Sequence, residues 1–306
     1  MNNVDIDLLK EITGTENGEF KGAYNIRKNG QGIERQITEN INIVTKQDVS
    51  GIDIHVKENT KFEFVHIPVI ITESGLSDVV YNDFYIGENA NVIIVAGCGI
   101  HNDHHKDSQH DGIHRFFLEK GARVKYIEKH YGEGNGEGKR ILNPVTEVYL
   151  KDGATLEMES AQIKGVDSTI RTTKGVLEEN TNFVVTEKIM THGTQNADSV
   201  FEVELNGENA STKVTSRSVA TEESTQEFRS KVTGNAKCFG HVECDAIIKD
   251  TAKVIAIPEI VANNVEANLI HEAAIGKIAG EQLTKLMTLG LTEKEAEEAI
   301  INGFLK

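Results

Sequence analysis

A short turn pattern recurs along the chain and limits the possible fold more than any other feature. In this pattern an acidic or small residue is followed by Asn or Gly and then by a small residue, as at 88–90 (Glu-Asn-Ala) and 152–154 (Asp-Gly-Ala). Asn and Gly tolerate the left-handed backbone of a tight turn, and a small side chain fits a crowded inward corner. The spacing is about 30 residues until a shorter last step, with the small residues at 60, 90, 122, 154, 181, 210, 236 and 252.

The stretches that follow these turns are typical of β-strands. After Ala90 the chain reads Asn-Val-Ile-Ile-Val-Ala, and after Ala122 it reads Arg-Val-Lys-Tyr-Ile-Glu-Lys. These runs are rich in β-branched residues, and several alternate with a period of two. Short strands at a fixed long period favour a β-solenoid, in which each turn stacks on the last. A Greek-key sandwich or a cupin-like barrel is the alternative.

The two ends of the chain differ from this β region. Residues 5–12 predict one short helix, and from 271 onward apolar residues recur at helical spacing. Thr292 and Glu295 fit a capping box at the start of a second helix. We expect the apolar stripe of this hairpin to cover the open end of the solenoid, and it could also dock a partner. The expected parts are an N-terminal segment with a short helix (1–45), a β-solenoid core (46–268) and a C-terminal helical subdomain (269–306).

Charge and composition limit the partners. The 306 residues include 32 Lys or Arg and 48 Asp or Glu, which gives a formal net charge of −16. Nucleic acids and anionic membrane surfaces attract an excess of positive charge, so we expect neither as a partner. The sequence has no apolar run of about 18 residues and no basic signal-peptide start. Three cysteines do not make a disulfide scaffold in a chain of this length, so we expect a cytoplasmic protein with reduced thiols.

One segment is dense in potential metal ligands. It begins at Cys98 and contains five of the 11 histidines, namely His101, His104, His105, His110 and His114. Thiolate, imidazole and carboxylate ligands together suit borderline metals such as zinc or ferrous iron. A complete four-ligand signature is absent from the sequence. The alternative is therefore a polar loop whose histidines are hydrogen-bonded or solvated.

A second group of such residues lies near the C-terminus. Cys244 belongs to an alternating stretch, and His271 and Glu272 follow in the next one. If the two strands are neighbours, the three side chains could approach one another and bind iron or zinc, or the thiolate could act as a nucleophile. A buried inert cysteine and a helix-start glutamate are the alternative. The sequence contains no phosphate-binding loop, dinucleotide fingerprint or nucleophile elbow, so any ATP hydrolysis is expected in another chain.

The C-terminal third resembles the SufB/SufD family, the core proteins of the SUF iron–sulfur assembly system. Residues 243–245 (Glu-Cys-Asp), 257–259 (Ile-Pro-Glu) and 271–273 (His-Glu-Ala) resemble, in the same order, the family's Cys-Asp, Pro-x-(Ile)-Glu and His-Glu-Ala segment, and the following residues resemble its closing helices. A looser similarity extends over roughly 75–300. The resemblance implies a right-handed parallel β-helix with a C-terminal α-helical hairpin, in agreement with the turn pattern.

The resemblance also implies a function. It implies a scaffold that builds a nascent iron–sulfur cluster, docks a SufC-type ABC ATPase on its terminal helices and receives cysteine-derived sulfur. It further implies a dimer, with an identical chain or a paralogue, joined through the C-terminal ends of the β-helices. By position, Cys244, His271 and Glu272 correspond to residues at that interface, and Cys98 corresponds to a cysteine that receives or relays sulfur.

Two departures from the family pattern are visible. No cysteine precedes Cys98, although SufB-type members often carry N-terminal cysteine motifs, and the chain is shorter than usual members. This suggests a minimal form that works as a homodimer. The histidines at 101–114 have no counterpart that the resemblance supplies. The alternatives are therefore a metal-dependent β-solenoid enzyme or metal-binding protein that uses Cys98 and these histidines with zinc or iron, and a structural subunit that only positions the ATPase.

Overall fold

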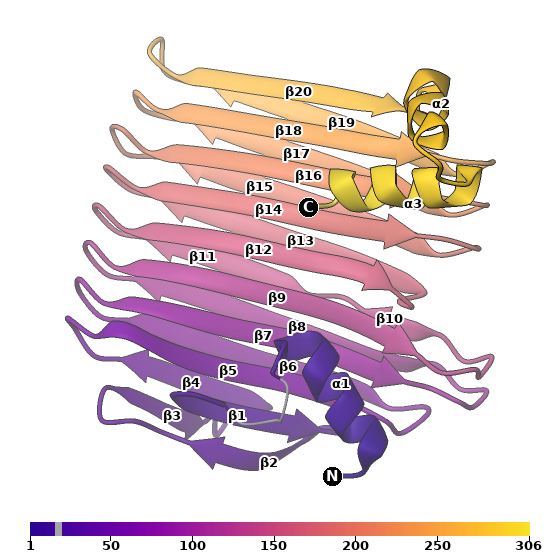
Figure 1. Cartoon of the computed structure of the whole chain (residues 1–306). Coiled ribbons are helices and arrows are strands. Elements are labelled where there is room, and N and C mark those ends of the chain that lie inside the picture. Colours follow the sequence, from indigo (N-terminus) through magenta and orange to yellow (C-terminus); the bar gives the residue numbers. More distant parts are fainter. Residues whose placement is uncertain (16–19) are drawn as a thin grey trace.

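The chain forms a parallel β-solenoid (Figure 1). The computed structural model describes residues 1–15 and 20–306. Over these residues the strands fall into two ten-stranded sheets, A and B, and successive strands of the solenoid alternate between them. The predicted solenoid is therefore confirmed, and neither a Greek-key sandwich nor a cupin-like barrel is formed.

Each sheet is ordered along the solenoid axis. Sheet A contains β2 (Gln31–Gln36), β1 (Ala23–Lys28), β5 (Lys61–Ile71), β7 (Asn91–His101), β9 (Arg123–Glu133), β12 (Thr155–Lys164), β14 (Asn182–Thr191), β16 (Ser211–Ala220), β18 (Phe239–Ile248) and β20 (Asn268–Gly276). Sheet B contains β3 (Ile41–Thr45), β4 (Gly51–Val56), β6 (Ser77–Ile86), β8 (Ser108–Leu118), β10 (Arg140–Leu142), β11 (Val145–Leu150), β13 (Ser168–Leu177), β15 (Asn196–Leu205), β17 (Thr225–Gly234) and β19 (Lys253–Ala262).

The turn residues identified in the sequence fix the stacking of the layers. Asn89 and Gly121 have left-handed φ angles of 54° and 66°. Each donates its backbone N–H to the turn of the next layer, at 3.0 Å to Lys120 and 3.0 Å to Asp152 respectively. The small residue after the turn is buried, and Ala154 is 0% exposed. For the residues at 60, 90, 122, 154, 181 and 210, the spacing of the pattern is therefore the stacking period of the solenoid. The last two positions were assigned wrongly, because Cys238 and not Ala236 follows Ala210 in the stack, and Ala252 precedes a strand of the other sheet.

Inward side chains of successive layers form one continuous hydrophobic core. Along β9, β14 and β15 every second residue is buried. Equivalent residues stack directly, as in Phe84 over Phe116, whose ring centroids lie 4.4 Å apart with planes only 3° from parallel. The same core cluster extends from Ala23 in β1 to Cys244 in β18. It therefore runs along almost the whole axis.

The N-terminal end of the solenoid is covered. Antiparallel pairs β1–β2 and β3–β4 close the sheets there, and helix α1 (Asn3–Thr13) lies against β7 at the outside of sheet A (Figure 1). A Cβ atom on Gly97 would lie only 2.9 Å from Cβ of Ile12, so the glycine allows this close approach. The helix predicted over residues 5–12 is confirmed.

The C-terminal end differs from the expectation. Residues 271–276 belong to strand β20, and the helices begin later, with α2 (Gly280–Thr288) and α3 (Glu293–Phe304). The predicted helix start at 271 is therefore wrong. The pairing of this segment with β18 overrides its helical spacing. The capping box between Thr292 and Glu295 is present as predicted.

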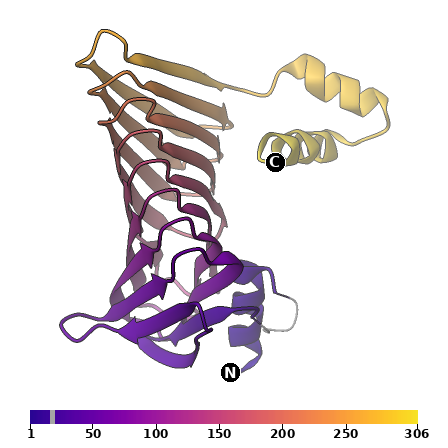
Figure 2. The ribbon, with the colours of Figure 1, turned by 90° about the vertical axis from the view of Figure 1, so that its left-hand side faces the viewer.

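The helical hairpin does not cover the open end of the solenoid. It lies beside sheet A, and the last strands stay uncovered (Figure 2). Lys249 donates to Glu297 at 2.7 Å, and Arg217 donates to the carbonyl of Phe304 at 3.3 Å. These contacts hold α3 to the flank of the solenoid. The expectation of a cap is therefore wrong. No helix among the described residues is both long and apolar enough to span a membrane.

The buried corners predict a stability effect. Ala154→Leu places three extra carbons in a corner that is 0% exposed, and overpacking of this kind costs about 1–3 kcal/mol. We expect a lower midpoint in urea-induced unfolding. Ala299→Leu, at an exposed position of α3, is the matched control and should change the free energy of unfolding by less than about 0.5 kcal/mol. Equal midpoints for the two variants would contradict the role of the corner.

Candidate functional site

The C-terminal residues singled out in the sequence lie on paired strands. Cys244 is in β18 and His271 is in β20, and the register places His271 opposite Val242, two residues from Cys244. Val242 and Cys244 are each 2% exposed and face inward. His271 therefore faces the same side of sheet A as Cys244. Both of its ring nitrogens are buried and have no hydrogen-bond partner among the described residues.

Glu272 faces the other side of the sheet. It pairs in register with Glu243 on the outer face, and its carboxylate lies 3.3 Å from Nε2 of His241. Its side chain is 65% exposed. Within one chain, the structure thus places Cys244 and His271 on the same face of sheet A and Glu272 on the other, because neighbouring residues of a strand point to opposite faces.

A column of buried charged side chains lies in the interior of the solenoid, in the layers that precede β18 and β20. Arg171 in β13 donates to Glu128 in β9, and its Nε lies 3.3 Å from Glu187 in β14. These three side chains are at most 5% exposed. Burial acts to raise the pKa of Glu128, but His130 and Arg171 beside it outweigh burial and lower that pKa to about 2. Pairing is what makes such buried charges tolerable.

Hydroxyl groups extend this column to Cys244. Ser199 and Ser216 donate to the two carboxylate oxygens of Glu187 at 2.7 and 3.0 Å. Ser216 in turn stands opposite Cys244 in the register of β16 and β18. Burial, with a contribution from the charge of Glu187, raises the pKa of Cys244 to about 12. The free thiol is therefore protonated at neutral pH and needs a metal or a base to become a thiolate.

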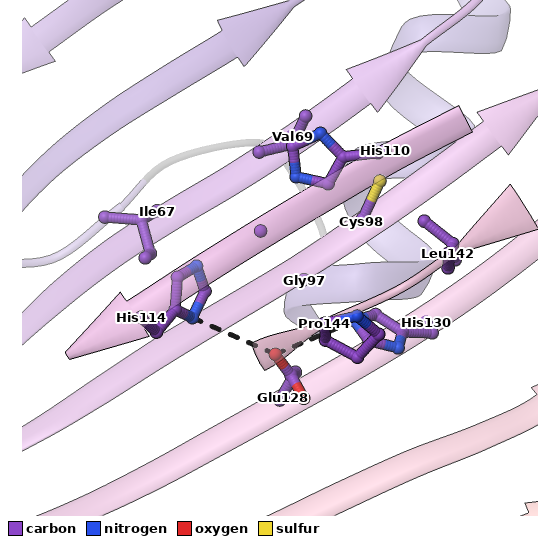
Figure 3. A pocket seen from close by; sticks show the side chains of 11 residues that line it. Ile67, Val69, Gly97, Cys98, His110, His114, Glu128, His130, Leu142 and Pro144 are labelled. Carbon is purple, nitrogen blue, oxygen red and sulfur yellow. Dashed lines mark ion pairs between the residues drawn. The ribbon is translucent and has the colours of Figure 1, made fainter. Parts of the chain in front are cut away.

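Cys98 lies near the other end of the column. It faces inward from β7 and is 3% exposed. It lines a cavity of ≈ 10 Å³ together with His110, His114, Glu128 and His130 (Figure 3). Burial raises the pKa of the Cys98 thiol well above its usual value. The cavity has room for one water molecule or one small ion.

The five histidines of the predicted metal segment lie in two separate places. On strand β8, His110 and His114 face inward and are 5% and 7% exposed. His101 ends β7, and His104 and His105 follow in the exposed loop. Over residues 1–15 and 20–306, no three His, Cys, Asp or Glu side chains stand ready to hold a metal ion. The five histidines thus do not form one preformed cluster.

Several residues of the interior were missed in the sequence. Tyr126, Glu128 and His130 share the inward face of β9 and are buried. The sequence predicted this strand but did not predict that these polar side chains are buried. A signal was present, because polar residues two apart in a solenoid strand fall on the same face as the apolar core. Arg171 and Glu187 carry the same signal in later layers. Arg171 pairs with Glu128, 43 residues away, and with Glu187, 16 residues away. The sequence spacing alone does not show that these residues meet.

The buried histidines predict a pH dependence of stability. Burial lowers the pKa of His114 to about 4, whereas an unfolded histidine titrates near pH 6.5. As the pH falls from about 6.5 to about 4, the unfolded chain gains a proton that the native state does not, so the stabilisation present above this range is lost. We expect His114→Gln to make the decline in unfolding midpoint between pH 6.5 and 4.5 shallower.

The matched control for this experiment is His105→Asn. Its side chain is 83% exposed, so the pH profile of the unfolding midpoint should follow that of the parent chain. Other buried histidines, such as His130 with its pKa lowered to about 3, still contribute in both variants. An unchanged profile in His114→Gln would show that this imidazole is not held neutral in the folded protein.

Comparison with known proteins places these features in a family. A family model described as "SUF system FeS cluster assembly, SufBD core domain" matches residues 84–304. An iron–sulfur cluster assembly SufBD family protein of Methanocaldococcus jannaschii is 29% identical over 295 residues, which cover 93% of this chain and 90% of that protein. A SufBD family protein of Pyrococcus horikoshii is 30% identical over 263 residues, 84% of this chain and 57% of that protein.

A bacterial relative is more distant. The iron–sulfur cluster assembly protein SufB of Bacillus subtilis is 28% identical over 229 residues, which cover 72% of this chain and 47% of that protein. The chain thus spans nearly all of the M. jannaschii protein and about half of the other two. The matched region contains every strand from β7 to β20 and both terminal helices. The chain therefore belongs to the SufBD family of SUF-system iron–sulfur cluster assembly proteins.

Proposed function

We propose that the chain is a scaffold on which a nascent iron–sulfur cluster is assembled in the cytoplasm, without ATP hydrolysis of its own. The observation that carries this proposal is the position of Cys244 and His271 on one face of two paired strands at the uncovered end of the solenoid. Sulfur ligands hold iron and sulfide firmly, whereas an imidazole is an exchangeable ligand that lets a cluster leave. The two unpartnered nitrogens of His271 are available for such a role.

The open end supports assembly with a second subunit. Strands β19 and β20 are the last strands of their sheets, so each has an unpaired edge. Exposed apolar side chains accompany these edges, including Ile257 at 40% and Ile260 at 45%. An exposed edge of this kind is a template for pairing with another chain. A second copy or a paralogue joined here would bring two Cys244–His271 pairs towards one shared site.

Glu272 lies on the opposite face of sheet A from Cys244 and His271, so its proposed role is different. In one chain it lies on the outer face of sheet A, hydrogen-bonded to His241. It is therefore not a ligand beside Cys244 within the same subunit. We propose that Glu272 acts at the rim of the subunit contact, where its exposed carboxylate is available to iron or to the second chain.

The terminal helices are the proposed docking site of a SufC-type ABC ATPase. They project beside the solenoid (Figure 2). Their large apolar side chains include Leu289, which is 77% exposed, and Met287, which is 44% exposed. Because α3 is held to sheet A by Arg217 in β16 and by Lys249, which directly follows β18, movement of a bound ATPase would pull on β16 and on β18, the strand that carries Cys244. In this way nucleotide binding in the partner could open or close the cluster site.

Cys98 is the proposed entry point for cysteine-derived sulfur. It lies five sheet-A layers from Cys244, which is about 24 Å at the usual strand spacing. The buried column of Glu128, Arg171 and Glu187 lies between the two thiols. A polar interior of this kind supports passage of sulfur along the axis, because an apolar core would exclude a charged sulfur species.

The role of Cys244 is tested by anaerobic reconstitution with iron and sulfide. We expect Cys244→Ala to lose most of the cluster absorbance of the parent chain, because the remaining ligands do not hold iron and sulfide without the thiolate. Cys238→Ala is the matched control, since Cys238 is also buried in the last turns but lies six residues away, immediately before β18. Full cluster loading in Cys244→Ala would overturn the proposed function.

Two surface variants distinguish the proposed ATPase docking site from the proposed dimer contact. Leu289→Asp in the loop between the helices should abolish co-purification of the ATPase and leave the dimer intact. Ile260→Asp at the open edge should do the reverse, because it puts a charge where the second subunit pairs. Size-exclusion chromatography and pull-down with the ATPase measure both. Loss of the ATPase in the Ile260 variant alone would contradict docking on the helices.

A further inference from the structure

We propose that the interior cavity beside Cys98 binds one divalent transition-metal ion, zinc or ferrous iron, through Nε2 of His110, Nε2 of His114 and Sγ of Cys98. This site is separate from the one at Cys244. It shares Cys98 with the sulfur entry point proposed above, but the geometry that supports it does not depend on the proposed scaffold function. It lies in the N-terminal half of the solenoid, between β7 and β8 (Figure 3). The argument rests on how hydrogen bonds orient the two imidazoles.

The hydrogen bonds of His110 leave one of its nitrogens free for a metal. Its Nδ1 lies 3.1 Å from Asp78 Oδ2. The Asp78 carboxylate is also held by Arg27 and is ionised, so it can only accept, and Nδ1 must carry the proton. In the neutral imidazole, Nε2 of His110 is then the nitrogen without a proton. No hydrogen bond to it is present among the described residues.

A second chain of hydrogen bonds fixes His114 in the same tautomer. Tyr126 donates its hydroxyl proton to Glu128 at 2.8 Å, so the Tyr126 oxygen accepts from Nδ1 of His114 at 2.6 Å. Nε2 of His114 is again unprotonated, and it accepts only a 3.3 Å bond from Asn82. A carboxylate behind each imidazole, directly or through a phenol, is the outer-shell arrangement that accompanies metal-binding histidines in proteins.

The Nε2 atoms of His110 and His114 flank a space left by a glycine. A Cβ atom on Gly112 would lie 3.4 Å from Nε2 of His110 and 3.3 Å from Nε2 of His114. Both imidazoles therefore flank the same empty position, where any other residue would put a carbon atom. Cys98 lines the same cavity, whose volume of ≈ 10 Å³ suits one small ion.

The donor set selects the class of ion. Two imidazoles and one thiolate match the ligands of zinc and of ferrous iron, and they are unsuited to magnesium or calcium, which require oxygen ligands. Across the described ranges the donors do not yet surround one point at bonding distance. Binding therefore requires rotation of the Cys98 side chain towards the two nitrogens, and the thiol proton is released as the metal–sulfur bond forms.

Metal titration of the chelator-treated, full-length protein tests the proposal. Under anaerobic conditions, equilibrium dialysis with zinc or with ferrous iron in separate arms should give one ion per chain, and the tighter arm identifies the preferred ion. Cobalt(II), used as a coloured probe, should show a thiolate-to-metal absorption band that disappears in Cys98→Ser. Cys244→Ala should keep both the ion and the band, which separates this site from the proposed cluster site.

Three variants probe the geometry. Gly112→Ala fills the space between the nitrogens, and His110→Asn removes one of them, so each should weaken zinc or iron binding at least tenfold. Tyr126→Phe removes the hydrogen-bond partner of His114 and should weaken metal binding by about 10–100-fold. Far-UV circular dichroism confirms that each variant is folded. The triple variant His101→Asn, His104→Asn, His105→Asn should bind as tightly as the parent chain.

Two results would overturn the proposal. One is a parent chain that binds neither ion, which would leave water as the occupant of the cavity. The other is loss of the ion in the triple loop variant with full binding in folded Gly112→Ala, which would move the site to the exposed loop. Either result leaves the cluster experiment on Cys244 unaffected.

Discussion

The stacking of layers through left-handed turns is the constraint on which the rest of the structure depends. Each turn at an Asn or Gly donates a backbone N–H to the turn above, and side-chain amides add a second ladder, as in Asn209 donating to Asn180 at 3.1 Å. This locks the register of neighbouring strands, so an inward residue in one layer is inward in every layer. A residue therefore meets partners from turns about 30 positions away, and distant residues can form one column.

That register explains how polar chemistry is held inside an apolar core. Glu128, Arg171 and Glu187 come from three different layers, yet each is placed to neutralise the next. Leaving any one of them unpaired in this interior would cost several kcal/mol. The same geometry sets Gly112 between two imidazoles and puts Ser216 opposite Cys244. The interior is thus a packed core along most of its width and a hydrogen-bonded polar path along part of it.

The two ends of the solenoid are treated differently. Antiparallel pairs close the N-terminal end, whereas the C-terminal end keeps two unpaired edges because α3 is attached to the flank of sheet A. An uncovered strand edge promotes aggregation of a monomer, but it provides a pairing surface in an assembly. The location of Cys244 and His271 in these last layers therefore supports the proposed assembly of a cluster at a contact between chains.

The sequence alone determined the solenoid, its period, the helices at both ends, and Cys244, Cys98 and His271 as residues of interest. These follow from local rules, since turn residues, strand alternation and capping boxes act over a few positions. It did not determine that residues 271–276 stay in the sheet, that the hairpin leaves the open end bare, or that Glu272 faces away from Cys244. Nor did it separate the inward His110 and His114 from the loop histidines. Only the tertiary structure decided these, because each depends on which distant layer a residue is packed against.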